Sequence, residues 1–172
     1  MADAAAGAKK TWSEQHRRLV TDARYGHVYN NLCERFYSRC DFWLNVLQTG
    51  AGSTVLVAAA TVLFGDNKGA IPPVLTAITG SALSLLAMAG MFWQPAVRAE
   101  RHRIASAAFL DLHGRAWSMK TEQLARELAD TQKLAPLGPR GLELPAFNRN
   151  VVALGFPPEK MTRWERFLDA VS

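Results

Sequence analysis

The sequence predicts an all-α membrane protein: a two-helix transmembrane hairpin continued by long cytoplasmic helices, plus two short C-terminal helices. Two apolar stretches predict the hairpin, Leu44 to Phe64 and Ile71 to Trp93, and neither contains a charged side chain. Each is about 20 residues long, which lets a helix cross the ~30 Å hydrocarbon core of a bilayer. Because only residues 65–70 separate the stretches, the two helices must run antiparallel.

Aromatic and charged residues mark the ends of these stretches. Trp43 precedes the first stretch, Phe92 and Trp93 close the second, and Arg98 follows. Aromatic rings at the ends of a span favour the headgroup level, and Arg98 closes the apolar region from outside, so these four residues are the expected interface anchors. A buried hairpin inside a soluble bundle is the alternative, but buried helices seldom run this far without a charge.

The distribution of arginine predicts the orientation. Arginines flank the hairpin on its open side, at positions 35, 39, 98, 101 and 103, whereas the connecting turn holds one Lys and one Asp. By the positive-inside rule both termini are cytoplasmic, in a bacterial inner membrane, and the turn faces outward. The net charge of +5 is explained by this topology and by anionic headgroups, so no direct nucleic-acid binding is expected.

The remaining chain divides into short segments. Residues 1–12 read as a disordered leader, 13–42 as a cytoplasmic helix, 43–93 as the hairpin, 94–135 as a long cytoplasmic helix, and 136–172 as a loop with short helices. Ser13 can cap the first helix, Gly26 is a weak point in it, and Pro95 predicts a kink. One apolar stripe follows this first helix into the hairpin, at positions 25, 29, 32, 36, 40, 43 and 47. A second, from Ile104 through Ala108, Leu112 and Met119 to Leu128, follows the later helix.

No residue pattern indicates catalysis. The chain has no Gly-rich phosphate loop, nucleophile elbow or zinc-ligand spacing, and His16, His27, His102 and His113 are expected to be surface or packing residues. Cys33 and Cys40 lie about 10 Å apart along one helix, beyond disulfide reach, and should be reduced thiols. We therefore expect no enzyme activity, no metal and no cofactor.

Polar and small residues inside the apolar stretches are the informative chemistry. Candidate pore-lining residues are Asn45, Gln48, Thr49 and Gly52, and candidate helix-packing residues are Thr76, Gly80, Ser84 and Ala87. Amides in hydrocarbon need a partner or water, and small residues let helices approach closely. Two hypotheses remain open: the Asn45 face joins helices together, or the same face of several subunits lines a pore. The small-residue stripe packs the hairpin in both.

The order of segments, together with scattered residues, resembles the SLATT family between about Asp22 and Gly155. The resemblance is carried by residues 23–27 (ARYGH), 34–36 (ERF), the hairpin, 99–102 (AERH), 144–150 (LPAFNRN) and 154–155 (LG). Members are two-transmembrane effectors of bacterial conflict systems. The resemblance implies a homo-oligomer that perforates the inner membrane and arrests infected cells, and a separate sensor protein or signalling ligand as its trigger.

Two other function classes remain as alternatives. A phage holin-like lysis protein also places a small hairpin in the inner membrane, but such proteins rarely carry this much cytoplasmic helix. A non-perforating membrane anchor would instead recruit a cytoplasmic partner through the region of Trp117 and Trp164. The sequence predicts the lipid bilayer as a partner in all three cases.

The arginine asymmetry generates a topology prediction. Reporter domains fused after Ser172 should be active only in the cytoplasm, and reporters inserted in the turn between Asp66 and Gly69 only in the periplasm. Paired reporters with opposite compartment requirements measure both sites. A reporter after Ser172 that works only in the periplasm would contradict the predicted orientation.

Overall fold

The structure, a computed structural model, describes residues 12–64 and 73–172, with side chains given except at residues 51, 54–64 and 73–77. Every regular element in these ranges is a helix, so the all-α class is confirmed. The principal helices are α1 (Glu14–Phe64), α2 (Pro73–Trp93), α3 (Pro95–Arg115), α4 (Thr121–Leu134), α5 (Glu143–Ala153) and α6 (Arg163–Ala170). The 3₁₀ turns η2 (Ala116–Ser118) and η3 (Arg140–Leu142) precede α4 and α5.

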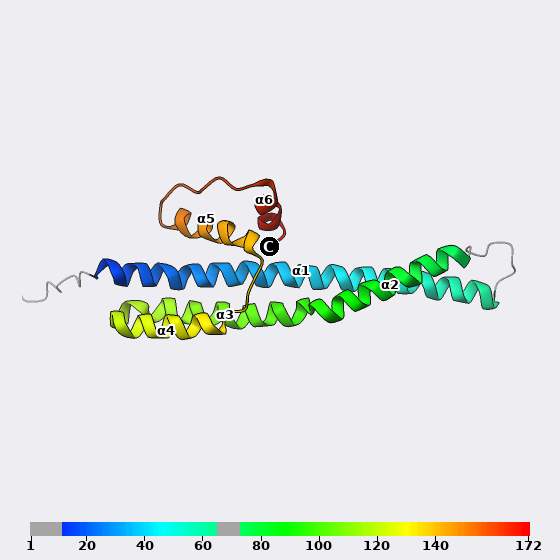
Figure 1. Cartoon of the computed structure of the whole chain (residues 1–172), viewed down its shortest axis with the longest axis horizontal. Helices are drawn as coiled ribbons and strands as arrows, with labels where there is room; N and C mark the ends of the chain where they lie inside the picture. Colours follow the sequence, from blue (N-terminus) through cyan, green and yellow to red (C-terminus); the bar gives the residue numbers. More distant parts are fainter. Residues whose placement is uncertain (1–11, 65–72) are drawn as a thin grey trace, which may run out of the picture.

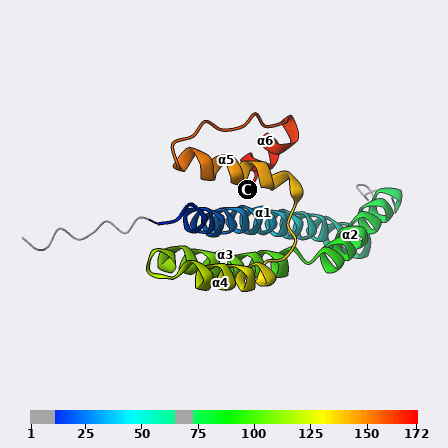
Figure 2. The same ribbon diagram turned by 60° about the vertical axis from the view of Figure 1, so that its left-hand side comes forward.

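Helix α1 runs the length of the molecule, and the other elements pack along it (Figure 1). Helices α3 and α4 form an antiparallel pair on one side of its first half, while α5 and α6 lie on the opposite side (Figures 1 and 2). Helix α2 runs beside the second half of α1 and leads into α3. The predicted single helix from the N-terminal arm into the hairpin is thus confirmed, and α1 is 51 residues long.

Within the described residues, no helix combines the length and the hydrophobicity that crossing a membrane requires. The predicted spans fall partly on residues 65–72, which lie outside the described residues, and on residues 51, 54–64 and 73–77, whose side chains also lie outside them. Residues 1–11 of the predicted leader lie outside as well. Trp12 is described, and its ring stacks on His16 with centroids 4.1 Å apart, so this residue does not belong to a disordered leader.

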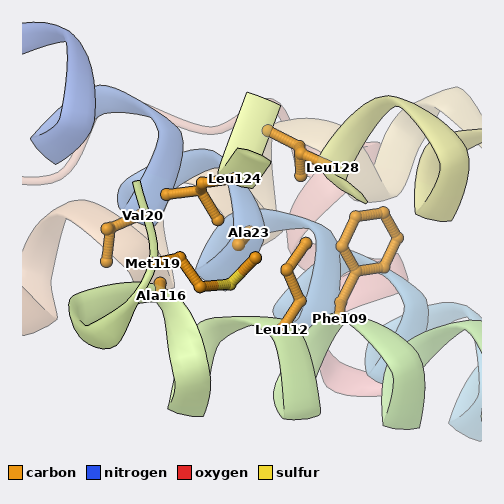
Figure 3. Packing of buried hydrophobic residues seen from close by; sticks show 8 residues of the cluster. All are labelled: Val20, Ala23, Phe109, Leu112, Ala116, Met119, Leu124 and Leu128. Carbon is orange, nitrogen blue, oxygen red and sulfur yellow. The ribbon is translucent and has the colours of Figure 1, made fainter. Parts of the chain in front are cut away.

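A first core joins α1, α3 and α4 (Figure 3). Its buried residues are Val20, Ala23, Phe109, Leu112, Ala116, Met119, Leu124 and Leu128. A second core lies on the other face of α1 and comprises Leu32, Cys33, Tyr37, Ala99, Leu142, Ala146 and Leu168. Because α1 is covered on two faces, it needs two buried stripes, of which the sequence pattern predicted one.

The predicted helix over residues 94–135 is wrong in its middle. The chain turns back at η2 and Met119, where extended backbone precedes α4. This reversal of chain direction places Leu124 and Leu128 on the first core. A continuous helix would instead carry both residues away from that core. The predicted stripe is right from Leu112 onward, because Leu112, Met119, Leu124 and Leu128 are buried in this core. Its start is wrong, since Ile104 is 54% exposed whereas His102, Ser106 and Phe109 are buried.

Gly26 is a close-approach site and does not interrupt α1. A Cβ atom built there would lie 2.6 Å from two carbons of the Phe109 ring, closer than real Cβ atoms come. The missing side chain therefore allows α3 to pack directly on the α1 backbone. Phe109 is 3% exposed and cannot readily move aside.

Replacing this glycine should destabilise the bundle. We expect Gly26→Ala to lower the free energy of unfolding by about 1–3 kcal/mol, because overpacking forces the Phe109 ring or a helix to shift. Gly114→Ala in α3 is the matched control, since nothing lies within 4 Å of its Cβ position. That change should be neutral or stabilising by up to about 1 kcal/mol. Thermal unfolding of both full-length variants in detergent, followed by circular dichroism, measures the difference; equal melting temperatures would contradict the close approach.

Candidate functional site at the hairpin junction

Four histidines hydrogen-bond across the contact between α1 and the α3–α4 pair. His16 Nε2 lies 3.1 Å from the carbonyl oxygen of Ala116, and His27 Nδ1 lies 3.0 Å from the Ser106 hydroxyl. From the other side, His102 Nδ1 lies 2.8 Å from the Asn30 side-chain oxygen, and His113 Nδ1 lies 3.3 Å from the Val20 carbonyl. We call this set of contacts the polar seam.

The polar seam shows that the four histidines are packing residues, one of the two roles that the sequence allowed, and not surface residues. His16 and His102 are fully buried, and each of the four contacts another helix. The sequence spacing could have indicated this packing, because His16 and His27 are separated by 11 residues, and so are His102 and His113. Eleven residues are close to three turns, so each pair shares one helix face.

Tyr37 lies where the polar seam meets the hairpin. Its ring stacks on the His102 ring, with centroids 5.5 Å apart and planes at 14°. The Trp93 ring meets it edge-on at 6.1 Å, and the Arg98 guanidinium carbon lies 5.8 Å from the Tyr37 centroid. Tyr37 itself is 4% exposed. One buried ring from α1 therefore contacts the last residue of α2 and two residues of α3.

The break between α2 and α3 is confirmed at Gln94, before Pro95. Gln94 is the one non-glycine residue with positive φ in the described part of the chain, at φ 47° and ψ 55°. Residues without glycine's freedom pay about 1–3 kcal/mol for such a backbone. Arg98 helps to hold the bend, since its Nε donates to the Trp93 carbonyl at 2.9 Å. The junction is thus a defined bend between the hairpin and the bundle.

Burial keeps His102 neutral. Desolvation, and secondarily the nearby Arg98 charge, lower the pKa of His102 to about 4. Asn30 donates its amide to the Gly26 carbonyl at 2.8 Å, so its oxygen faces His102 and accepts from Nδ1–H. Nε2 then carries a lone pair that is buried and has no hydrogen-bond partner among the described residues. A proton added at Nε2 would therefore be buried without a compensating acceptor.

An apolar groove adjoins the junction. It has a volume of about 670 Å³ and lies between α1, the end of α2 and α6. Its walls include Trp43, Leu44, Leu47, Trp93, Trp164 and Phe167. The floor is closed by Leu168, which packs on Gly141 where a side chain would collide. Sequence reasoning missed this groove because its walls come from three distant segments.

The candidate pore-lining residues do not share one environment. Asn45 and Thr49 are exposed and, with Asp41, border a shallow hollow whose lining is mostly apolar. The Asn45 amide donates to Asp41 at 3.1 Å. Gln48 instead faces α2 and donates to the Leu86 carbonyl at 3.3 Å. Gly52 has no other side chain within 4 Å of its Cβ position. Asn45 and Gln48 are neighbours on the surface of α1, about 60° apart around its axis, but their surroundings differ: Gln48 contacts α2 whereas Asn45 is exposed.

In the part of α2 whose side chains are described, the small-residue stripe is largely exposed. Ser84 and Ala87 are exposed, Gly80 has open space at its Cβ position, and the side chain of Thr76 lies outside the described ones. Gly90 lies near α1, since its Cβ position is 3.4 Å from Gln48 Nε2. Contact between subunits through Gly80 stays a prediction.

The expected interface anchors surround the junction. Trp43 is 61% and Phe92 75% exposed, whereas Trp93 and Arg98 contact Tyr37. Both cysteines are free, as their spacing predicts, and burial raises the pKa of Cys33 to about 12, so it is an unreactive thiol. Among the described residues, no three His, Cys, Asp or Glu side chains gather to hold a metal ion.

Comparison with family models finds no match, and neither curated proteins nor solved structures yield one.

The environment of His102 predicts acid sensitivity. Because its folded pKa of about 4 lies below the ordinary 6.5, the unfolded state binds more protons between these pH values. The stability contribution of neutral His102 is present above pH 6.5 and is lost as pH falls toward 4, by at most about 3 kcal/mol. Unfolding measured across this pH range in detergent should show the loss.

The variant His102→Gln should remove that part of the pH dependence, because glutamine does not titrate. Ser106→Ala is the control: it removes a hydrogen bond from the same polar seam and should keep the wild-type slope. A wild-type slope in His102→Gln would show that His102 does not cause the acid sensitivity.

Proposed function

We propose that this chain is a membrane-perforating effector of bacterial antiphage defence, of the kind represented by the SLATT family. It would lie in the inner membrane with both termini in the cytoplasm and assemble as a homo-oligomer. A sensor protein or signalling ligand would trigger it. The hairpin of α1 and α2 would insert in the bilayer, and the bundle of α1, α3 and α4 would receive the trigger.

One observation carries this proposal: large apolar side chains are exposed along both helices of the hairpin. They include Phe42, Trp43, Val46 and Leu47 on α1, and Ile78, Leu85, Met88, Met91 and Phe92 on α2. A monomeric soluble protein rarely exposes a contiguous apolar surface of this extent. Lipid or neighbouring subunits would cover it.

Two exposed polar side chains on α1 support a conducting role over simple anchoring. Asn45 and Thr49 are exposed in the same region as these apolar side chains, and Asp41 borders the same hollow. Polar groups in hydrocarbon need water or a partner. In an oligomer, copies of this face would form a polar path, whereas Gln48, bonded to Leu86, would hold the two helices of each hairpin together.

A membrane anchor that recruits a cytoplasmic partner is the second candidate. It is favoured by two exposed rings in the bundle, Trp117 at 48% and Trp164 at 62%. This candidate needs no polar path through the membrane, so variants of Asn45 separate it from perforation.

Separate variants of the two amides test the proposed division of roles. Asn45→Leu should insert and assemble normally, yet uptake of a membrane-impermeant dye by overexpressing cells should fall by about tenfold or more. A leucine ring favours dewetting, and a barrier raised by about 1.4 kcal/mol has this effect. Gln48→Leu should instead weaken the hairpin by about 1 kcal/mol and reduce the oligomer on blue native gels.

Leu85→Ile on α2 is the control, because it changes an apolar residue of the hairpin that is 67% exposed, lies outside the hollow at Asn45 and carries no polar group. Wild-type dye uptake by Asn45→Leu, with a normal oligomer, would exclude Asn45 from the path. Absence of dye uptake by the wild-type protein under strong expression, with normal membrane insertion, would favour the anchor.

A further inference from the structure

We infer that the apolar groove between α1, α2 and α6 binds an acyl chain of an anionic phospholipid, with the headgroup phosphate on Arg39. The inference rests on the proposed membrane insertion and adds to it a specific lipid site. The lipid site would also give α6 a function, since the proposed pore does not involve this helix.

The groove has the size and chemistry of a ligand site. Its volume of about 670 Å³ falls within the range of about 300–1,000 Å³ that is typical of small-molecule pockets. Leu44 and Leu47 of α1 form one wall, and Trp164 and Phe167 of α6 form the other, their rings stacked with centroids 5.5 Å apart. Such walls accommodate an alkyl chain without leaving a polar group unpaired.

Continuity with the exposed hairpin surface favours lipid over a peptide or a second copy. Trp43, Leu44 and Leu47 belong both to the groove and to the apolar segment that is proposed to enter the bilayer. Trp43 and Trp93 mark the expected headgroup level. A chain of a membrane lipid can therefore pass from the bilayer into the groove along a continuous apolar surface.

Arg39 supplies a cation at the rim. It is the one charged residue among those lining the groove, and it is exposed. Its guanidinium donates to the Ala170 carbonyl at 3.1 Å, which fixes it beside the end of α6. Arginine has five N–H donors in a planar fork that matches phosphate oxygens. Arg39 can therefore bind a headgroup phosphate while it donates to the Ala170 carbonyl.

Fluorescence quenching by brominated lipid tests occupancy. Full-length protein in detergent micelles is titrated with phosphatidylglycerol whose acyl chains carry bromine, which quenches tryptophan on contact. The fluorescence of Trp164 is obtained as the difference in emission between the wild type and Trp164→Phe. This difference should decrease as brominated lipid is added. Trp117→Phe provides the control difference, since Trp117 lies in η2, distant from the groove-lining segments, and should stay unquenched.

Headgroup recognition is tested by a second pair of variants. Arg39→Gln should weaken the binding of brominated phosphatidylglycerol about fivefold, because this is the effect of one cation near an anionic surface. The binding of brominated phosphatidylcholine should be unaffected. Arg18→Gln is the control, because Arg18 lies near the start of α1, paired with Glu14. Inorganic phosphate should not compete, since the acyl chain provides most of the contact.

The outcomes separate this site from the proposed membrane function. If the Trp164 difference is unquenched while the remaining tryptophans are quenched and the protein floats with phosphatidylglycerol vesicles, the lipid site is overturned and membrane insertion stands. If no tryptophan is quenched and the protein does not float, both proposals fail. Equal effects of Arg39→Gln and Arg18→Gln would overturn the assignment of the headgroup to Arg39.

Discussion

The direct packing of α3 on the backbone of α1 is the constraint on which the rest of the structure depends. Gly26 leaves room for the Phe109 ring, and polar side chains above and below that point are hydrogen-bonded across the helices. An unpaired buried donor or acceptor costs about 1–3 kcal/mol. A slip of α3 along α1 would break several of these bonds at once, so the polar seam specifies one register.

With α3 placed, the other elements follow. Helix α4 turns back and covers the first core with Leu124 and Leu128, while α5 and α6 cover the opposite face of α1. The two short helices are held to each other as well, since Arg149 of α5 donates to Asp169 of α6 at 2.8 Å. Thr162 and Glu165 form a reciprocal capping box that begins α6. The C-terminal segment is thereby fixed beside the apolar groove.

Tyr37 connects the hairpin to this bundle. Trp93 at the end of α2 and His102 in α3 both contact its ring, and the bend at Gln94 lies between them. In the proposed function, a trigger that shifts α3 along or around α1 would change the direction of α2 through these contacts. Such coupling requires that one packed element, here α2, can adopt two arrangements. The bend at Gln94 is suited to this because its backbone conformation is sparsely populated.

The sequence by itself determined the helical class, the unbroken course of α1, the break at Gln94 and Pro95, and the free cysteines, because each is a local property. Helix periodicity, proline chemistry and residue spacing act within a few turns of chain. The stripe of Leu32, Phe36 and Cys40 also lies on the face that packs on α5 and α6. Only the tertiary structure decided the face of α1 that packs on α3, the reversal at Met119, and the different surroundings of Asn45 and Gln48. Apart from Val20, the α3-facing side of α1 presents small and polar residues, Ala23, Gly26 and Asn30, which hydrophobic periodicity cannot detect. These residues are important because of the partners they contact, which lie about 70 to 90 residues away in the sequence. No local sequence pattern encodes packing between segments so far apart.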